Sequence, residues 1–130
     1  PTQLCDWTDA IKEWNHDDDE EDYIIKDGET PIGWLGINGL SSEDKIAYLK
    51  MAVILPDYQN KGIGHYSINQ VIEMLKNRNY SKTILYTDQE NHKAQSCYRK
   101  CGFEVTEIHT EEMSNGKIVP RCKMELEINK

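Results

Sequence analysis

The spacing of apolar residues divides the chain into a strand-rich first half and a mixed second half. Three β-rich runs with alternating apolar positions cover residues 23–26, 31–40 and 46–55, with turn residues between them. Asp27 and Gly28 form a hairpin-turn signal, and Pro56 stops the third run because proline cannot donate a ladder hydrogen bond. The pattern predicts three consecutive antiparallel strands.

Downstream of residue 60 the apolar positions follow a helical period. Ile68, Val71, Ile72 and Leu75 recur at i, i+3, i+4 and i+7, which predicts an amphipathic helix over residues 62–77. A short apolar strand over 83–87 precedes a second helix over 91–101, and Gly102 stands where a left-handed cap is usual. Two alternating runs, 103–113 and 117–128, then predict a hairpin turning at 114–116.

Two features precede the first strand. Thr8 as a helix cap, with Ile11 and Trp14 three residues apart, predicts a short helix over 8–15. Six consecutive acids at 17–22 favour a solvated loop, and attraction of a cationic substrate is the alternative. The order of elements predicts an α/β fold in one domain over 1–130, with a mixed, mainly antiparallel central sheet flanked by helices.

Composition limits the classes of partner. The chain has 130 residues, 15 of them basic and 23 acidic, so its formal net charge is −8. This balance argues against binding to nucleic acid or to an anionic membrane surface, and it is compatible with cationic partners. Without the block at 17–22, 17 acidic residues stand against 15 basic ones, so the imbalance is local.

The chain also lacks the sequence marks of export and of metal binding. No apolar run reaches the length of a membrane span, and charged residues occupy the N-terminus where a signal peptide needs apolar ones. We therefore expect a cytoplasmic protein whose four cysteines are reduced thiols. No pair has the Cys-x-x-Cys spacing of a metal site, and Cys97 and Cys101 are expected to pack on one helix face.

The turn at residues 55–64 joins a buried strand to an amphipathic helix and carries Gly62 and Gly64. Glycine lets a backbone approach a ligand closely, and the N–H groups of a helix start attract anions. We therefore expect this turn to hold a phosphate or pyrophosphate. It lacks the Gly-Lys-Ser/Thr of a P-loop, and Ser67 stands where a dinucleotide fingerprint needs glycine or alanine.

Two motifs occur together around this turn. The first is Gln59-x-x-Gly62-x-Gly64 with Pro56 three residues upstream, and the second is Asn91-x-x-Ala94-x-x-x-Tyr98-x-Lys100-x-Gly102-Phe103. In this order, with a helix and a strand between them, they resemble the acetyl-CoA motifs of the GNAT N-acetyltransferases. The resemblance spans residues 23–130. It implies a GNAT-like (acyl-CoA N-acyltransferase) fold with a shortened N-terminal region, because relatives usually carry a strand and two helices there.

The resemblance also implies roles for residues. The turn would hold the pyrophosphate of acetyl-CoA, strand 51–55 would splay from strand 83–87, and backbone N–H groups in the gap would polarise the thioester carbonyl. Tyr98 would protonate the leaving thiolate as general acid. The implied coenzyme-binding residues are Ala52, Val53, Ile54, Gln59, Asn60, Lys61, Gly62, Ile63, Gly64, Asn91, Ala94 and Lys100.

The general base stays open, because no carboxylate lies inside the run 46–55, where some family members carry one. Glu43 or Asp44 acting through water, His109 or Glu107 on a late strand, and attack by a neutral amine are the alternatives. Cys97 adjoins Tyr98, but helix neighbours point about 100° apart, which disfavours it as a nucleophile.

These observations give a functional hypothesis. The chain is expected to transfer acetyl from acetyl-CoA directly to a primary amine of a small cationic molecule. The alternatives are acetylation of a protein N-terminus or lysine, a non-catalytic acetyl-CoA sensor, and a nucleotide-binding domain with Asp88 as the ribose ligand. Both a monomer and a homodimer remain open.

Overall fold

A computed structural model describes the backbone of residues 11–16 and the whole of residues 19–129. Within these residues the chain forms a seven-stranded sheet of order β1-β2-β3-β4-β5-β7-β6 and two α-helices. The strands are β1 (Ile11–His16), β2 (Glu21–Asp27), β3 (Thr30–Asn38), β4 (Ile46–Ile54), β5 (Lys82–Asp88), β6 (Glu104–Glu112) and β7 (Ile118–Glu127). The helices are α1 (Ile63–Asn77) and α2 (His92–Lys100), and a 3₁₀ turn, η2 (Pro56–Tyr58), follows β4.

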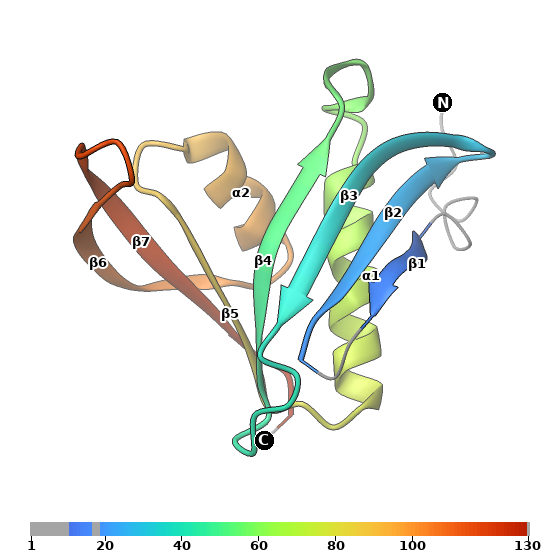
Figure 1. The fold of residues 1–130 in the computed structure, drawn as a ribbon, viewed down its shortest axis with the longest axis horizontal. Coiled ribbons are helices and arrows are strands. Elements are labelled where there is room, and N and C mark those ends of the chain that lie inside the picture. The colour runs from blue at the N-terminus through green and yellow to red at the C-terminus, as the bar shows by residue number, and fades with distance from the viewer. Residues whose placement is uncertain (1–10, 17–18, 130) are drawn as a thin grey trace.

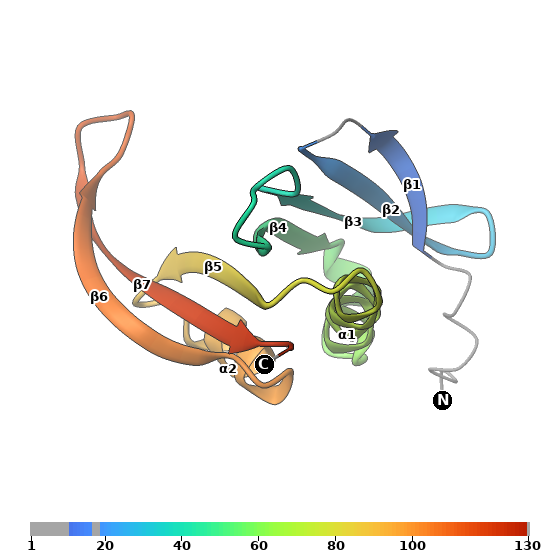
Figure 2. The same ribbon diagram turned by 90° about the horizontal axis from the view of Figure 1, so that it is seen from below.

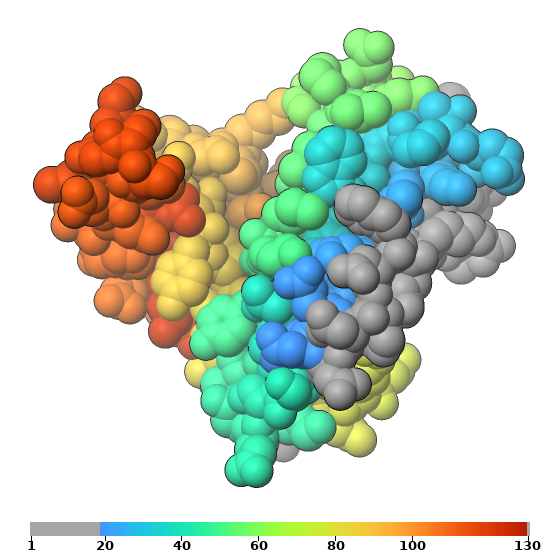
Figure 3. Space-filling view, in the orientation of Figure 1, coloured from blue at the N-terminus to red at the C-terminus, as the bar shows by residue number. Residues whose placement is uncertain are grey.

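The sheet is mixed and mainly antiparallel, which confirms the predicted fold class. Among the described strands only β4 and β5 run parallel, and they pair over a short stretch, from Ile46 opposite Lys82 to Tyr48 opposite Ile84. Beyond Tyr48 the two strands diverge, so that β1–β4 and β5–β7–β6 form the two arms of a V (Figure 1). In Figure 3 the yellow side chains of β5 lie between the red strands of their own arm and the green strand β4 of the other.

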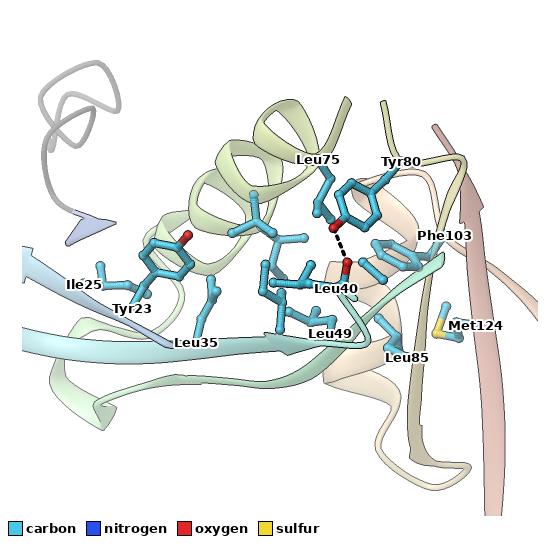
Figure 4. Packing of buried hydrophobic residues seen from close by; sticks show 14 of the residues in the cluster. Tyr23, Ile25, Leu35, Leu40, Leu49, Leu75, Tyr80, Leu85, Phe103 and Met124 are labelled. Atoms are coloured by element: carbon cyan, nitrogen blue, oxygen red, sulfur yellow. Dashed lines mark hydrogen bonds between the residues drawn. The ribbon is translucent and has the colours of Figure 1, made fainter. Parts of the chain in front are cut away.

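Both helices cover the same face of the sheet (Figure 2). The face of α1 predicted from its helical period is the buried one, because Ile68, Val71 and Leu75 belong to the core while Ile72 lies partly exposed beside it. The core continues across β2–β5 to Met124 on β7, and it includes Phe103 just after α2 (Figure 4). A hydrogen bond of 2.7 Å from the Tyr80 hydroxyl to the Leu40 carbonyl joins the segment before β5 to the loop after β3 at one end of the core (Figure 4).

The prediction of a helix over residues 8–15 is wrong where the structure describes it. Residues 11–15 lie in β1, which pairs antiparallel with β2 from Ile11 opposite Ile25 onward. The register shifts between Glu13 and Asn15, so Trp14 is the extra residue of a β-bulge. A short helix is marginal without tertiary contacts, whereas β1 gains a full ladder. Residues 8–10 lie outside the described residues.

The prediction of a solvated loop over 17–22 is wrong for its last two residues. Glu21 and Asp22 are buried and begin β2. The Glu21 carboxylate accepts hydrogen bonds from Arg78, 2.8 Å away at the end of α1, and from the Tyr23 hydroxyl. Lys50 of β4 forms ion pairs with Asp22 of β2 and with Glu20 just before β2, across the intervening strand β3. These acids therefore hold the N-terminal strands together, and Asp17 and Asp18 lie outside the described residues.

Candidate active site

A cavity of about 470 Å³ lies between the end of β4, the start of α1 and one face of α2. The predicted site residues other than Val53 and Lys61 line it: Ala52, Ile54, Gln59, Asn60, Gly62, Ile63, Gly64, Asn91, Ala94, Tyr98 and Lys100. The exposed Val53 lies between the two cavity-lining residues of its strand, and Lys61 is exposed with its ammonium 5.6 Å from the centre of the Tyr58 ring.

The cavity wall on β4 is set by a bulge and by the divergence of β4 from β5. Gly36 pairs with Met51 but Ile37 pairs with Leu49, so Lys50 is an extra residue that turns Ala52 and Ile54 toward the cavity. The Leu55 N–H donates to the Ile32 carbonyl on the β3 side, 2.8 Å away. Because ladder groups alternate sides, the N–H groups of Ala52 and Ile54 point away from β3 and into the gap.

The turn before α1 is shaped by left-handed residues and by one glutamine. Asn60 and Gly62 have φ of 63° and 81°. The Gln59 amide donates to the Ile54 carbonyl, 2.8 Å away, and its oxygen accepts from Lys93 at 3.2 Å. Gln59 thus fastens the turn to the end of β4 and brings a cation from α2 beside it.

The electrostatics of this end of the cavity suit an anion. The first N–H groups of any helix have no intrahelical acceptor. In α1, which begins after Gly62, no side-chain cap takes the place of that acceptor. Lys93 and Lys100 from α2 line the same cavity. A pyrophosphate fits this combination of free N–H groups and two cations.

Tyr98 lies on the cavity face of α2, with its ring edge against Phe103 at a centroid distance of 6.1 Å. Burial, more than the neighbouring thiols, raises the pKa of Tyr98 above that of a free phenol. The phenol is therefore protonated at neutral pH and can donate a proton. Asn91 also lines the cavity, but its oxygen caps α2 by accepting from the Ala94 N–H at 3.1 Å, so only its amide N–H groups can donate to a ligand.

The open alternatives for a base lie away from this cavity. Asp44 accepts from the Ser42 hydroxyl and from the Ile46 N–H, 3.1 Å away, at the opposite end of β4 from Ile54. Glu43 is exposed beside it. His109 on β6 meets the Tyr86 ring of β5 edge-on at 5.9 Å and does not line the cavity. The exposed Glu107 does not line it either.

Several lining residues were not predicted. Ile25, Leu35 and Ile68 form an apolar floor, and strand alternation would have placed the first two on this face. Lys93 carries no motif signal. Cys97 was set aside because helix neighbours diverge, yet it and Tyr98 both line the cavity. The cavity is wide enough to receive side chains from both positions.

The comparisons with known proteins identify the family. The sequence pattern of the acetyltransferase (GNAT) family matches residues 2–103. The chain belongs to this family. The resemblance recognised in its two motifs is therefore confirmed, and the cavity lies where those motifs meet.

Two curated relatives agree with this assignment. Mycothiol acetyltransferase of Thermobifida fusca is 30% identical over 69 residues, covering 53% of this chain and 21% of the relative. An uncharacterized N-acetyltransferase of Methanocaldococcus jannaschii is 28% identical over 107 residues, covering 78% of this chain and 47% of the relative. The chain thus spans less than half the length of either relative.

Solved structures show the same fold. Spermidine N-acetyltransferase from Vibrio cholerae, in complex with CoA and spermine, superposes with a TM-score of 0.78 at 26% identity, covering 87% of this chain and 68% of that one. The ribosomal-protein-S18-alanine N-acetyltransferase from Escherichia coli superposes with a TM-score of 0.76 at 18% identity, covering 96% and 85%. The latter likeness concerns the fold alone.

Two kinds of feature are absent from the part of the chain that the structure describes. None of the helices in residues 19–129 is both long and apolar enough to cross a bilayer. In the same residues, no three histidine, cysteine or acidic side chains gather closely enough to hold a metal ion.

Proposed function

We propose that this domain transfers the acetyl group of acetyl-CoA directly to a primary amine. The observation that carries the proposal is one continuous cavity that joins an anion-suited turn at Gly62 to a protonated Tyr98, beside the gap between β4 and β5. The cavity's donor set fits the coenzyme, because it combines cations and N–H groups for phosphates with N–H groups on β4 for amides. The CoA complex of the similar spermidine N-acetyltransferase supports the same use.

Acetyl-CoA supplies an activated thioester. The first turn of α1, with Lys93 and Lys100, holds the pyrophosphate. The N–H groups of Ala52 and Ile54 donate hydrogen bonds to the carbonyl oxygen and stabilise the negative charge that develops there when the amine attacks the carbonyl carbon. As the carbon–sulfur bond breaks, Tyr98 donates its proton to the leaving thiolate. The attacking nitrogen loses a proton to solvent, and the chain forms no covalent bond.

The acceptor is proposed to be a small cationic amine. The formal charge of −8 is compatible with a cationic acceptor. The similar Vibrio cholerae enzyme was solved with spermine. A protein N-terminus or lysine is the second candidate, because the described N-terminal region contributes strands and no helix that would wall the acceptor side. A cytoplasmic location and a monomer or homodimer stay predictions.

The test is a turnover assay with acetyl-CoA and a panel of amines and peptides, following release of the CoA thiol. Tyr98→Phe should lower kcat by about 10²–10⁴-fold, the usual contribution of a general acid, with little change in CoA affinity by calorimetry. Tyr86→Phe is the matched control, because this exposed tyrosine of β5 lies outside the cavity.

Each result decides between hypotheses. Full activity in Tyr98→Phe refutes its role as the acid. Binding of acetyl-CoA without turnover on any amine or peptide points to the non-catalytic sensor. Failure to bind acetyl-CoA, with binding of a nicotinamide dinucleotide instead, refutes the proposal as a whole.

A further inference from the structure

The bulge of β4 carries an ion pair that the proposed mechanism does not use. Lys50 is the extra residue of this bulge, and its side chain reaches across β3 to two acids. Its ammonium lies 3.1 Å from the Asp22 carboxylate on β2 and 2.7 Å from the Glu20 carboxylate just before β2. The hydrogen bond to Glu20 outweighs the effect of desolvation and raises the pKa of Lys50. The side chain is therefore charged at neutral pH and remains attracted to both acids.

Gly36 on β3 makes this crossing possible. It pairs with Asp22 on one side and with Met51 on the other. A Cβ atom at this position would lie 2.5 Å from the Asp22 carboxylate oxygen and 2.8 Å from the Cε atom of Lys50, both too close for a real side chain. The Lys50 and Asp22 side chains therefore meet in the space that glycine leaves open on β3, although a whole strand lies between their own strands.

The bulge lies at the point where β4 separates from β5. The parallel ladder ends at Tyr48, two residues before Lys50, and Ala52 lines the cavity two residues after it. Leu49 and Ala52 both pack against the same core, although they are three residues apart. In a regular strand, the residues on one face are an even number of positions apart. The extra residue is therefore what brings Ala52 to the cavity and turns its N–H into the gap.

We propose that Lys50 is a positioning residue for the acetyl transfer, because its ion pair over Gly36 fixes the bulge that places the Ala52 N–H at the thioester carbonyl. The inference rests on the proposed function, which assigns this N–H to the carbonyl oxygen. Lys50 does not line the cavity, so it acts through the backbone of its own strand. Loss of the pair lets the bulge relax and the N–H move, and a misplacement of about 1 Å can lower a rate by about 10²-fold.

The experiment begins with Lys50→Met, which keeps the length of the side chain and removes its charge. With the best acceptor from the amine and peptide panel, kcat should fall by about 10- to 100-fold because the oxyanion donor is displaced. The Kd of acetyl-CoA by calorimetry should stay within about threefold, because the donor acts mainly in the transition state. Lys50→Arg keeps the charge and should restore most of kcat.

A second variant breaks the pair from β3. Gly36→Ala leaves every charge in the chain, but its methyl group would occupy the place where the Lys50 and Asp22 side chains meet. The three nearest atoms belong to these two side chains, which can move without the strands, so the variant should fold. Its kcat should fall by a similar factor. Gly36→Ala combined with Lys50→Met should be no slower than the slower single variant, because both changes remove the same pair.

Lys82→Met is the matched control. Lys82 on β5 pairs with Glu125 at 3.0 Å, and its side chain is 32% exposed against 31% for Lys50, but it lies in a regular ladder. Both variants should lose similar stability in urea, whereas only Lys50→Met should lose kcat. Infrared spectra of bound acetyl-CoA with an isotope-labelled carbonyl give a readout without turnover. Lys50→Met should move the carbonyl stretch back toward its frequency in solution, and Lys82→Met should not.

The outcomes separate the two proposals. Turnover in the parent chain with an unchanged kcat in Lys50→Met or in Gly36→Ala refutes the positioning role alone. An equal loss of kcat in Lys82→Met, or a loss in Lys50→Met without a change in the carbonyl stretch, also overturns that role. A parent chain that acetylates no amine or peptide refutes the proposed function and this inference with it.

Discussion

Replacement of Gly64 by alanine should move stability and coenzyme affinity in opposite directions. Gly64 is the second residue of α1, and its φ does not lie in the left-handed region, so alanine fits the backbone. The new Cβ would lie 3.7 Å from the Cys97 sulfur and 3.9 Å from an Ile54 side-chain carbon, which are ordinary contacts. Alanine is favoured over glycine in a helix by about 0.5–1 kcal/mol, so Gly64→Ala should be at least as stable as the parent chain.

The same methyl group enters the cavity, because Gly64, Cys97 and Ile54 all line it. A phosphate oxygen must come within about 2.9 Å of a backbone nitrogen to accept its hydrogen bond. A methyl group beside that nitrogen keeps other atoms at roughly 3.5–4 Å. We expect a loss of CoA affinity of at least about tenfold, or about 1.4 kcal/mol.

The assays are urea unfolding followed by circular dichroism and calorimetric titration with CoA. Gly116→Ala is the matched control, because Gly116 lies in the β6–β7 turn with φ of 83°, and a Cβ atom there would meet no other described residue within 4 Å. It should lose about 1–2 kcal/mol of stability through backbone strain and keep its CoA affinity. Unchanged CoA affinity in Gly64→Ala would refute the placement of the phosphates, and a destabilised Gly64→Ala would refute the packing argument.

Two further predictions concern the ends of the helices. Arg78→Ala should lower the free energy of unfolding by about 2 kcal/mol, less than the 3–5 kcal/mol of a fully buried pair, because the Glu21 side chain is 4% exposed but that of Arg78 is 41% exposed. Urea unfolding measures this loss, and an equal effect of Arg99→Ala on the exposed side of α2 would contradict it. Alkylation of Cys97 by iodoacetamide should accelerate as pH rises through about 7, because the thiolate is the reacting form. Because Cys101 is the main cause of the lowered pKa of Cys97, Cys101→Ala should raise the pH at which alkylation reaches half its maximal rate. A half-maximal pH near the ordinary thiol pKa in the parent chain would contradict this effect of Cys101.

The sequence predicted the elements whose local pattern and tertiary role agree. Ile68, Val71 and Leu75 show the helical period of α1, and the same three residues are buried in the core. The paired motifs likewise placed Gly62 and Tyr98 on the cavity. In both cases the residues that share a helix face or a turn stand at fixed intervals along the chain, so the sequence shows them directly.

The features that the sequence missed depend on contacts between distant segments. The strand β1 exists because β2 pairs with it, whereas its apolar residues, three apart along the chain, match a helical spacing. The burial of Glu21 requires Arg78, which lies 57 residues away along the chain. Cys97 and Lys93 line the cavity because β4 diverges from β5, and no local spacing encodes the width of that gap.

The short parallel ladder between β4 and β5 has a mechanical consequence. Pairing of Ile46–Tyr48 with Lys82–Ile84, together with contacts such as His65 to the Lys100 carbonyl at 3.3 Å, joins two arms that otherwise diverge. A coenzyme in the gap would touch β4 on one arm and α2 on the other. Coenzyme binding would then hold the two arms together and add RT ln(1 + [L]/Kd) to the free energy of unfolding of the domain. Amide hydrogen exchange at the diverging ends of β4 and β5 would slow as the coenzyme saturates the site.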